Sequence, residues 1–370
     1  MQTSTKIKKL LTGSAVPLLF LIISALAIPL SKLSSTYLIS EVVSRVTRNS
    51  FLVLSLLLPV MAGMGINFGM VMGAMAGQIG LVFVTSWGIG GVPGLLIAAA
   101  IGTPISILLG YFGGQILNRA KGREMITSMM LGFFMAGIYL FFMLFLCGTI
   151  IPINNPTVLL SRGYGVRSTL SLPISGALNK LLILEVGSIK IPLVTAAIIV
   201  VLCLFMVWFR RTKMGQDMRA IGQDMSVAAA AGIAVDRTRI LSIIISTILA
   251  CYGQLIFLQD IGTLNTLNGS DQAALFAAAA LLIGGATVNK ATIANALFGT
   301  GLFHLMFVVM PVAGKNLTGQ AQLGQYLQQF VSYGVVTIAL IIHAWKRHKD
   351  RQIERTAMRQ ADLAVNYYKK

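Results

Sequence analysis

The sequence predicts an all-α integral membrane protein, a polytopic bundle of about ten transmembrane helices, some of them short or broken. Three observations lead to this fold class. The chain is 56% hydrophobic and only 11% charged. It contains repeated apolar runs of about 20 residues, which is the length that a helix needs to cross a bilayer. Its basic residues collect in a few segments between and beyond these runs.

Hydropathy places the spans along the chain, each bounded where an apolar run meets charged or polar residues. The predicted spans are 11–30, 51–66, 68–87, 93–118, 125–149, 191–209, 239–258, 273–287, 291–312 and 328–345. They make residues 1–345 a single transmembrane domain and residues 346–370 a basic tail. The first span has a basic start and an Ala25-Leu26-Ala27 end, as cleavable signal peptides do. Of the two interpretations, a cleaved signal peptide and an uncleaved span, the uncleaved span is favoured.

Lysine and arginine decide the orientation of these spans, because cytoplasmic loops carry an excess of both residues. An even number of crossings puts both termini on one side, and most of the 29 basic residues fall on that side. We therefore expect both termini in the cytoplasm. The net charge of +18 then reflects orientation, and contact of the tail with lipid headgroups, rather than binding to nucleic acid.

Two segments on the outer face interrupt the pattern of spans. Residues 34–49 are polar but carry apolar side chains at helical spacing, so we expect a helix along the outer surface before the second span. Residues 150–190 form a loop with several prolines that is too long for a tight turn. A docking surface for an extracellular partner and a simple connector are both open interpretations of this loop.

Glycines are the most regular feature inside the predicted spans. They recur every four residues from Gly65 to Gly77, a spacing that lets a second helix backbone approach closely. Helix packing is one interpretation, and a broken helix beside a solute path, with amides that bind a polar solute, is the other. A second glycine pair ends the alanine-rich run 273–282 and resembles another interrupted span. The candidate translocation residues are Asn67, Gly69, Gly73, Gln78, Gly284 and Gly285.

Missing motifs narrow the function. Every acidic residue lies at or beyond the end of a predicted span, and among the histidines only His304 lies well inside one, where a proton-coupled carrier could use it. A lone histidine on a helix is more often a packing residue. The sequence has no phosphate-binding loop and no zinc-protease or serine-hydrolase motif, and its three cysteines lie in apolar runs without metal or disulfide spacing. We therefore expect a transport protein without catalytic or metal-binding residues and without its own energy source.

One polar, basic stretch, residues 210–239, lies between two predicted spans. It has a helix-forming centre, Asp217 to Ala231, and a Gly232-Ile233 stop, and its basic ends belong on the cytoplasmic side. A short surface helix is thus joined directly to a span on each side. A soluble partner that binds this helix can move the two spans.

The stretch from Thr212 resembles the cytoplasmic loop of permease subunits of bacterial ABC importers for ribose-type sugars, nucleosides and branched-chain amino acids. That loop reads approximately T-x-x-G-x-x-x-R-A-x-G-x-[ND]-x-x-A-A-x-x-x-G-I. The matching residues are Thr212, Gly215, Arg219, Ala220, Gly222, Asp224, Ala228, Gly232 and Ile233, and Ala229 lies one position beyond the Ala-Ala pair of the pattern. Residues 66–69 are similar to the first part of the family's I-N-[IL]-G-x-x-G motif, with Gly73 one position after its last glycine, and residues 124–131 are similar to its E-[VI]-I-[TS]-T-x-M-L run. Residues 284–285 and 296–299 resemble its last glycine region, whereas residues 249–254 and 288–291 depart from the family pattern near the expected solute path.

This resemblance implies a permease domain in the bacterial plasma (inner) membrane, with two permease chains, identical or related, forming the pathway. ABC ATPase subunits would hold ATP and Mg²⁺, an extracellular solute-binding (lipo)protein would deliver solute, and this chain would bind no cofactor. The residues implied to couple it to the ATPase are Gly215, Arg219, Ala220, Gly222, Ala228, Ala229, Gly232 and Ile233.

Two alternatives to the importer stay open. An ion-coupled secondary transporter can bind sodium through neutral oxygens, so the missing carboxylates do not exclude it. A structural or channel subunit is less favoured, because it gives the polar cytoplasmic helix no purpose. The sparse, uncharged polar groups in the spans favour a neutral or zwitterionic solute: a simple sugar or nucleoside first, a branched-chain amino acid second.

Overall fold

The structure is a computed structural model that describes residues 2–153, 155–187, 189–320, 322–330, 333, 334, 337 and 341. Within these residues five helices are long and apolar enough to cross a membrane, or six if the bent pair α7 and α8 forms one span. The helical, multi-span class is therefore confirmed, with five or six such helices described against the ten predicted. Most of the predicted span 328–345 and all of the predicted tail 346–370 lie outside the described residues.

The first half of the chain is almost entirely helical. Its elements are α1 (Gln2–Ser31), α2 (Ser35–Ser55), α3 (Leu57–Met61), the single turn η1 (Phe68–Met70), α4 (Val71–Ser86), α5 (Gly91–Arg119), α6 (Glu124–Phe141) and the π-helical turn η2 (Phe142–Leu146).

The second half adds short strands to the helices. Its elements are β1 (Thr169–Ser171), β2 (Ile183–Val186), β3 (Ile189–Pro192), α7 (Leu193–Phe209), α8 (Lys213–Gln223), α9 (Met225–Ala230), α10 (Val235–Ile261), β4 (Thr263–Asn265), α11 (Asp271–Ile283) and α12 (Ile293–Thr318).

Helices α4, α5 and α10 pack closely against one another and form the centre of the fold. Small residues allow this approach. A Cβ atom on Gly73 would lie 2.1 Å from the carbonyl oxygen of Thr247 in α10, and one on Gly80 would lie 2.4 Å from that of Ala98 in α5. Since real side chains do not come so near, Gly73 of the four-residue series joins α4 to α10 by backbone contact, and Gly80, three residues beyond that series, joins it to α5. The packing interpretation of these glycines is supported.

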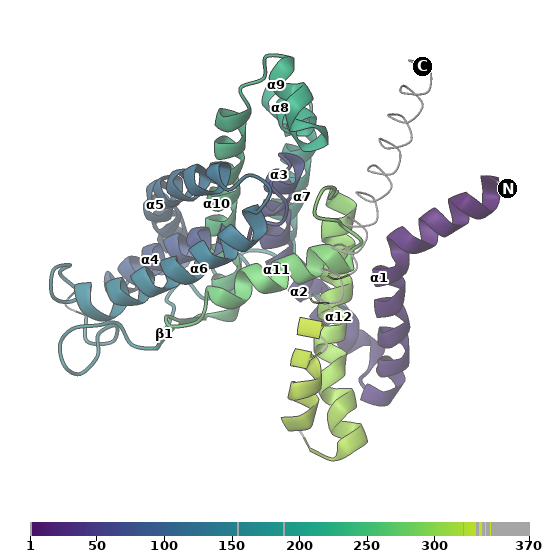
Figure 1. Ribbon diagram of the computed structural model, residues 1–370. Coiled ribbons are helices and arrows are strands. Elements are labelled where there is room, and N and C mark those ends of the chain that lie inside the picture. Colours follow the sequence, from purple (N-terminus) through teal and green to yellow (C-terminus); the bar gives the residue numbers. More distant parts are fainter. Residues whose placement is uncertain are drawn as a thin grey trace.

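A second group of helices comprises α1, α2 and α12, with α1 running alongside α12 (Figure 1). Apolar side chains from all three helices form a small cluster of their own: Ala27, Leu38, Val308, Val309 and Ala313. Helix α2 connects the two groups, because it also packs against α10.

The prediction of a surface helix over 34–49 followed by a separate span over 51–66 is wrong. Residues 35–55 form one helix, α2, so the helix predicted over 34–49 is present but continues into the first residues of the predicted span. Ser34 caps it by accepting a hydrogen bond at Oγ from the Tyr37 N–H at 3.3 Å. No helix breaker separates the amphipathic part from the apolar part, so the helix continues into the core, where residues 50–55 are buried. It ends before Leu56, and after α3 the chain leaves the helical path at Gly63 and Gly65, both at φ +72°.

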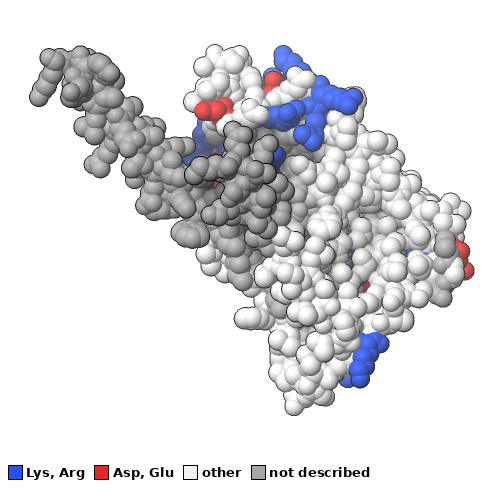
Figure 2. Space-filling view, turned by 90° about the vertical axis from the view of Figure 1, so that its right-hand side faces the viewer, with Lys and Arg blue, Asp and Glu red and all other residues white. Residues whose placement is uncertain are grey.

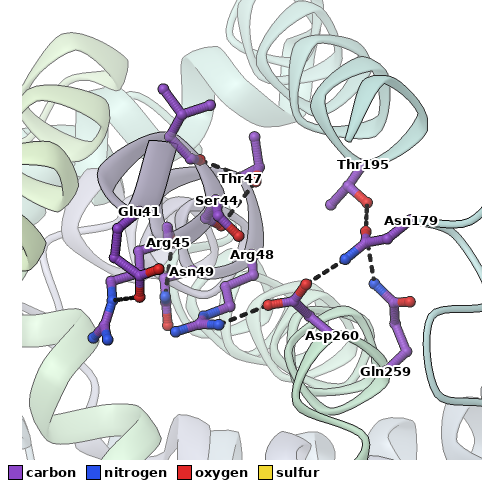
Figure 3. A network of polar contacts seen from close by, with 11 residues as sticks. Glu41, Ser44, Arg45, Thr47, Arg48, Asn49, Asn179, Thr195, Gln259 and Asp260 are labelled. Atoms are coloured by element: carbon purple, nitrogen blue, oxygen red, sulfur yellow. Dashed lines mark hydrogen bonds and ion pairs between the residues drawn. The ribbon is translucent and has the colours of Figure 1, made fainter. Parts of the chain in front are cut away.

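The loop 150–190 is folded onto the end of α10, which corrects the expectation of an all-helical chain. Strand β1 pairs antiparallel with β4, which directly follows α10, and β2 pairs with β3 in a hairpin. Polar side chains add to this contact (Figure 3). Arg48 of α2 forms an ion pair with Asp260 at 2.7 Å, Asn179 of the loop donates to the same carboxylate, and Thr195 donates to Asn179 at 2.7 Å. The loop therefore ties α2, α7 and α10 together at one end of the molecule, called the outer end below.

The opposite end carries α8 and α9, which project beyond the ends of the long helices (Figure 1). Lysine and arginine side chains gather at that same end, above a broad surface without charge (Figure 2). By the excess of basic residues that marks cytoplasmic loops, this end with α8 and α9 is the one that the sequence predicts to face the cytoplasm.

Candidate coupling site and solute path

Helix α8 begins immediately after the chain bends by 75° at the end of α7. Thr212 caps it, because its Oγ1 accepts a hydrogen bond from the Gly215 N–H at 3.3 Å. Gly215 also permits the bend itself: a Cβ atom there would lie 2.1 Å from the carbonyl oxygen of Phe209. The Thr-x-x-Gly spacing in the sequence is thus the local requirement for turning from a membrane helix to a surface helix.

The far end of α8 rests on the chain that follows α3. A Cβ atom on Gly222 would lie 2.3 Å from the carbonyl oxygen of Met61, and one on Gly63 would lie 3.0 Å from the Cα atom of Gly222. Met218 and Ile221 of α8 are buried beside this backbone contact. Helix α8 is therefore held against the end of α3 by backbone contact.

Helix α9 is capped at both ends. Asp224 Oδ1 accepts hydrogen bonds from the Ser226 hydroxyl at 2.6 Å, from the Ser226 N–H at 2.8 Å and from the Val227 N–H at 3.0 Å. The bond from the Ser226 hydroxyl, together with these two N–H groups, lowers the pKa of the Asp224 carboxyl below its ordinary value. The cap is therefore complete at neutral pH and weakens only as the carboxylate is protonated in acid.

The C-terminal end of α9 is a Schellman motif. Gly232 has φ +81°, its N–H donates to the Ala229 carbonyl at 3.0 Å, and the Ile233 N–H donates to the Ala228 carbonyl at 3.1 Å. Ile233 then packs with Ala228 and Val235, which is the apolar contact that usually accompanies this motif. The Gly-Ile stop predicted from the sequence is confirmed in its detailed geometry.

The residues predicted to couple to the ATPase fall into an inner and an outer group. Gly215 and Ala228 are buried, and Ala220, Gly222 and Ile233 are half-buried, so these five fix α8 and α9 to the protein; Arg219, Ala229 and Gly232 are exposed. Ala229 and Ile233 line an open groove of about 680 Å³. Sequence reasoning missed Val227, whose apolar side chain is 64% exposed on α9.

A buried ion pair connects α9 with two membrane helices, and sequence reasoning missed it. Arg239 of α10 is fully buried and is hydrogen-bonded to the carboxylate of Glu124, the first residue of α6. Another guanidinium nitrogen of Arg239 lies 3.6 Å from the sulfur of Met225 in α9. The sequence signal is weak, because each charge looks like an ordinary residue at the cytoplasmic end of an apolar run.

The candidate translocation residues lie at three different places. Asn67 caps η1 by accepting from the Gly69 N–H at 2.9 Å, and its Nδ2 has no hydrogen-bond partner in the part of the chain that is described. Gly73 lies against α10, and Gln78 is fully buried further along α4.

The glycine pair lies where α11 meets α12. A Cβ atom on Gly284 would lie 1.9 Å from the carbonyl oxygen of Asn295. Gly285 has φ +83° and lies in the turn that follows α11. These two glycines serve a turn and a close helix contact, as the interrupted span in the sequence suggests.

An effect of this close packing can be measured with Gly222→Ala. The added methyl group would overlap the Met61 carbonyl, and we expect a cost of about 1–3 kcal/mol, as for other overpacked sites, together with displacement of α8. Solute uptake by the variant should fall several-fold at unchanged membrane abundance. Gly137→Ala in α6 is the matched control, because its methyl group would meet open space; equal uptake by both variants would contradict the contact.

The architecture defines a multi-pass membrane protein with two short helices, α8 and α9, fixed to its core at one end. The family described as branched-chain amino acid transport system / permease component matches residues 35–340, so the chain belongs to this family of transport components. Over 183 residues it is 27% identical to the probable ABC transporter permease protein YphD of Escherichia coli (strain K12), covering 49% of this chain and 52% of that protein. The match thus spans about half the length of that relative. No solved structure matches the chain.

Proposed function

We propose that this chain is the membrane-spanning permease subunit of an ATP-binding-cassette importer in the bacterial plasma (inner) membrane. Two ATPase subunits, which hold ATP and Mg²⁺, bind the α8–α9 surface of two permease chains that are identical or related. An extracellular solute-binding (lipo)protein binds at the outer end. The observation that carries this proposal is the exposed helix pair α8 and α9: α8 is fixed to α3 by backbone contact, and α9 touches the buried Arg239–Glu124 pair through Met225.

The same contacts suggest how ATP binding moves the pathway. Closure of the ATPases displaces α8 and α9 together, since both are anchored in one cluster around Ile221 and Ala228. Gly222 transmits the displacement to α3, and Arg239 transmits it to α10 and to α6. The inner ends of the helices rotate as rigid bodies about the outer end, where the 150–190 loop ties α2, α7 and α10 together.

The solute is a small neutral or zwitterionic molecule, with a simple sugar or nucleoside favoured and a branched-chain amino acid as the second choice. Asn67 and Gln78 offer amide groups to it, because each has a buried polar atom without a partner among the described residues. Gly69, Gly73, Gly284 and Gly285 provide the close helix contacts that shift as access alternates between the two faces.

The test is purification of the chain from its native membranes in detergent. We expect an ATPase to co-purify with the wild type and with Ser161→Arg, a control in the exposed outer loop, and to be lost from Ala229→Arg, which places charge and bulk on the exposed side of α9. Equal retention by Ala229→Arg would contradict the docking assignment. A chain that purifies alone and moves solute under an ion gradient would be a secondary transporter instead.

A further inference from the structure

A cavity of about 230 Å³ lies toward the outer end, where α2, α10, α11 and α12 meet. The described residues that line it carry no carboxylate, ammonium or guanidinium group. Its wall combines two aromatic side chains with several polar ones: Phe257, Phe276, Asn49, Asn265, Gln272 and His304. An apolar cavity with a few converging polar groups is the usual form of a small-molecule site.

The cavity coincides with buried polar atoms that lack partners. His304 is only 6% exposed, and its Nδ1 has no hydrogen bond to any described residue. The side chains of Gln78 and Gln254 are fully buried. Both amide atoms of Gln78 and the Oε1 atom of Gln254 also have no hydrogen bond to any described residue. An unpaired buried polar atom costs about 1–3 kcal/mol, so a group of them requires an explanation.

Gly269 connects the two glutamines with the cavity. It lines the cavity, and its carbonyl accepts a hydrogen bond from Gln254 Nε2 at 3.3 Å. A methyl group on Gly269 would lie 3.1 Å from Gln78 Nε2. The two amides therefore lie directly behind this part of the wall, in a position to bind a molecule that passes inward from the cavity.

We propose that this cavity is a binding chamber for a neutral monosaccharide on its way through the permease, an assignment that rests on the proposed importer function. A sugar ring presents a flat apolar face to Phe276 and hydroxyl groups to His304 Nδ1 and the amides. The volume is below the range of about 300–1,000 Å³ typical of sites for larger ligands, which disfavours a nucleoside. The Arg48 guanidinium lies 5.9 Å from the centre of the Phe257 ring, but it is paired with Asp260 at 2.7 Å, so this pair is not free to bind a zwitterionic amino acid.

The first test is to fill the chamber with Ala273→Trp and to measure uptake by cells that carry the complete transporter. Radiolabelled pentoses and hexoses are the probes, with uridine and leucine as competing solute classes. We expect uptake of a sugar by the wild type and a loss of at least tenfold in Ala273→Trp. Val201→Trp on α7, at a position 64% exposed, is the matched control and should transport normally.

The second test concerns His304. His304→Phe preserves the ring but removes the acceptor, and we expect KM for the sugar to rise about tenfold, the effect of one lost hydrogen bond. His304→Asn places an amide oxygen near the position of Nδ1 and should restore most of the affinity. A merely structural histidine would instead change membrane abundance and leave KM unaltered.

The outcomes separate this assignment from the proposed function. Undiminished sugar uptake by Ala273→Trp overturns the chamber. Uptake of uridine or leucine, or of none of the sugars, overturns the monosaccharide assignment. Failure of any ATPase to co-purify with the wild type overturns the importer function, whatever the uptake result.

Discussion

Replacing Arg239 with methionine is expected to destabilise the folded protein by about 3–5 kcal/mol, because it leaves the Glu124 carboxylate buried without its partner. Glu124→Leu should have a comparable or larger effect, since Arg239 is fully buried. The measurement is the thermal midpoint of the detergent-solubilised protein, followed by loss of the monodisperse peak on heating. Both single variants should also reach the membrane in smaller amounts.

The double variant separates stability from coupling. With both charges removed no buried ion is left unpaired, so Glu124→Leu/Arg239→Met should recover most of the thermal midpoint. Its ATP-driven uptake should nevertheless stay low, because the contact among α6, α9 and α10 is gone. Recovery of uptake together with stability would show that the pair is purely structural.

A surface pair in the same region supplies the control. Lys121 and Asp236 lie 2.7 Å apart, and their side chains are 47% and 64% exposed. Lys121→Met should therefore change the stability by only about 0–1 kcal/mol, as exposed ion pairs do. A shift as large as that of Arg239→Met would mean that any charge removed at this end of the molecule destabilises it.

Hydropathy and local signals predicted the parts of this molecule that depend on neighbouring residues. The apolar runs correspond closely to α4, α5, α6 and α10, and the Gly232 signal marks the true end of α9. These features are set by residues within a few positions of each other, so one sequence suffices to find them. The single helix predicted over Asp217–Ala231 is wrong: α8 begins earlier, and Asp224 ends it and caps α9.

Features that depend on contacts between distant segments could not be predicted. Helix α2 continues through residue 50 because its apolar end is buried against α10, and the outer loop is ordered by pairing β1 with β4. The Arg239–Glu124 pair joins positions 115 residues apart. The chamber is similar: Gln78 was singled out as a polar group in an apolar run, but its proximity to Gly269 and Gln254 is a property of the fold alone.

Gly232→Val is expected to lower the rate of ATP-driven uptake at least tenfold, while the protein still folds and inserts into the membrane. The backbone at this position has φ +81°, a conformation that costs an L-residue about 1–2 kcal/mol and a β-branched one more. A Cβ atom here would meet nothing within 4 Å, so the substitution creates strain without a clash. Unwinding of the last turn of α9 relieves this strain. The unwound helix no longer presents the surface that the ATPase is proposed to bind.

Gly232→Asn tests whether backbone strain is the cause of the lost uptake. Asparagine tolerates the left-handed conformation far better than valine, although its side chain is more polar. We expect it to retain most of the uptake and of the co-purifying ATPase. If both variants lost uptake equally, the ATPase would contact the Cα of Gly232 itself and have no room for any side chain. If Gly232→Val transported normally, the end of α9 would play no part in coupling, and the groove beside Ala229 and Ile233 would have another purpose.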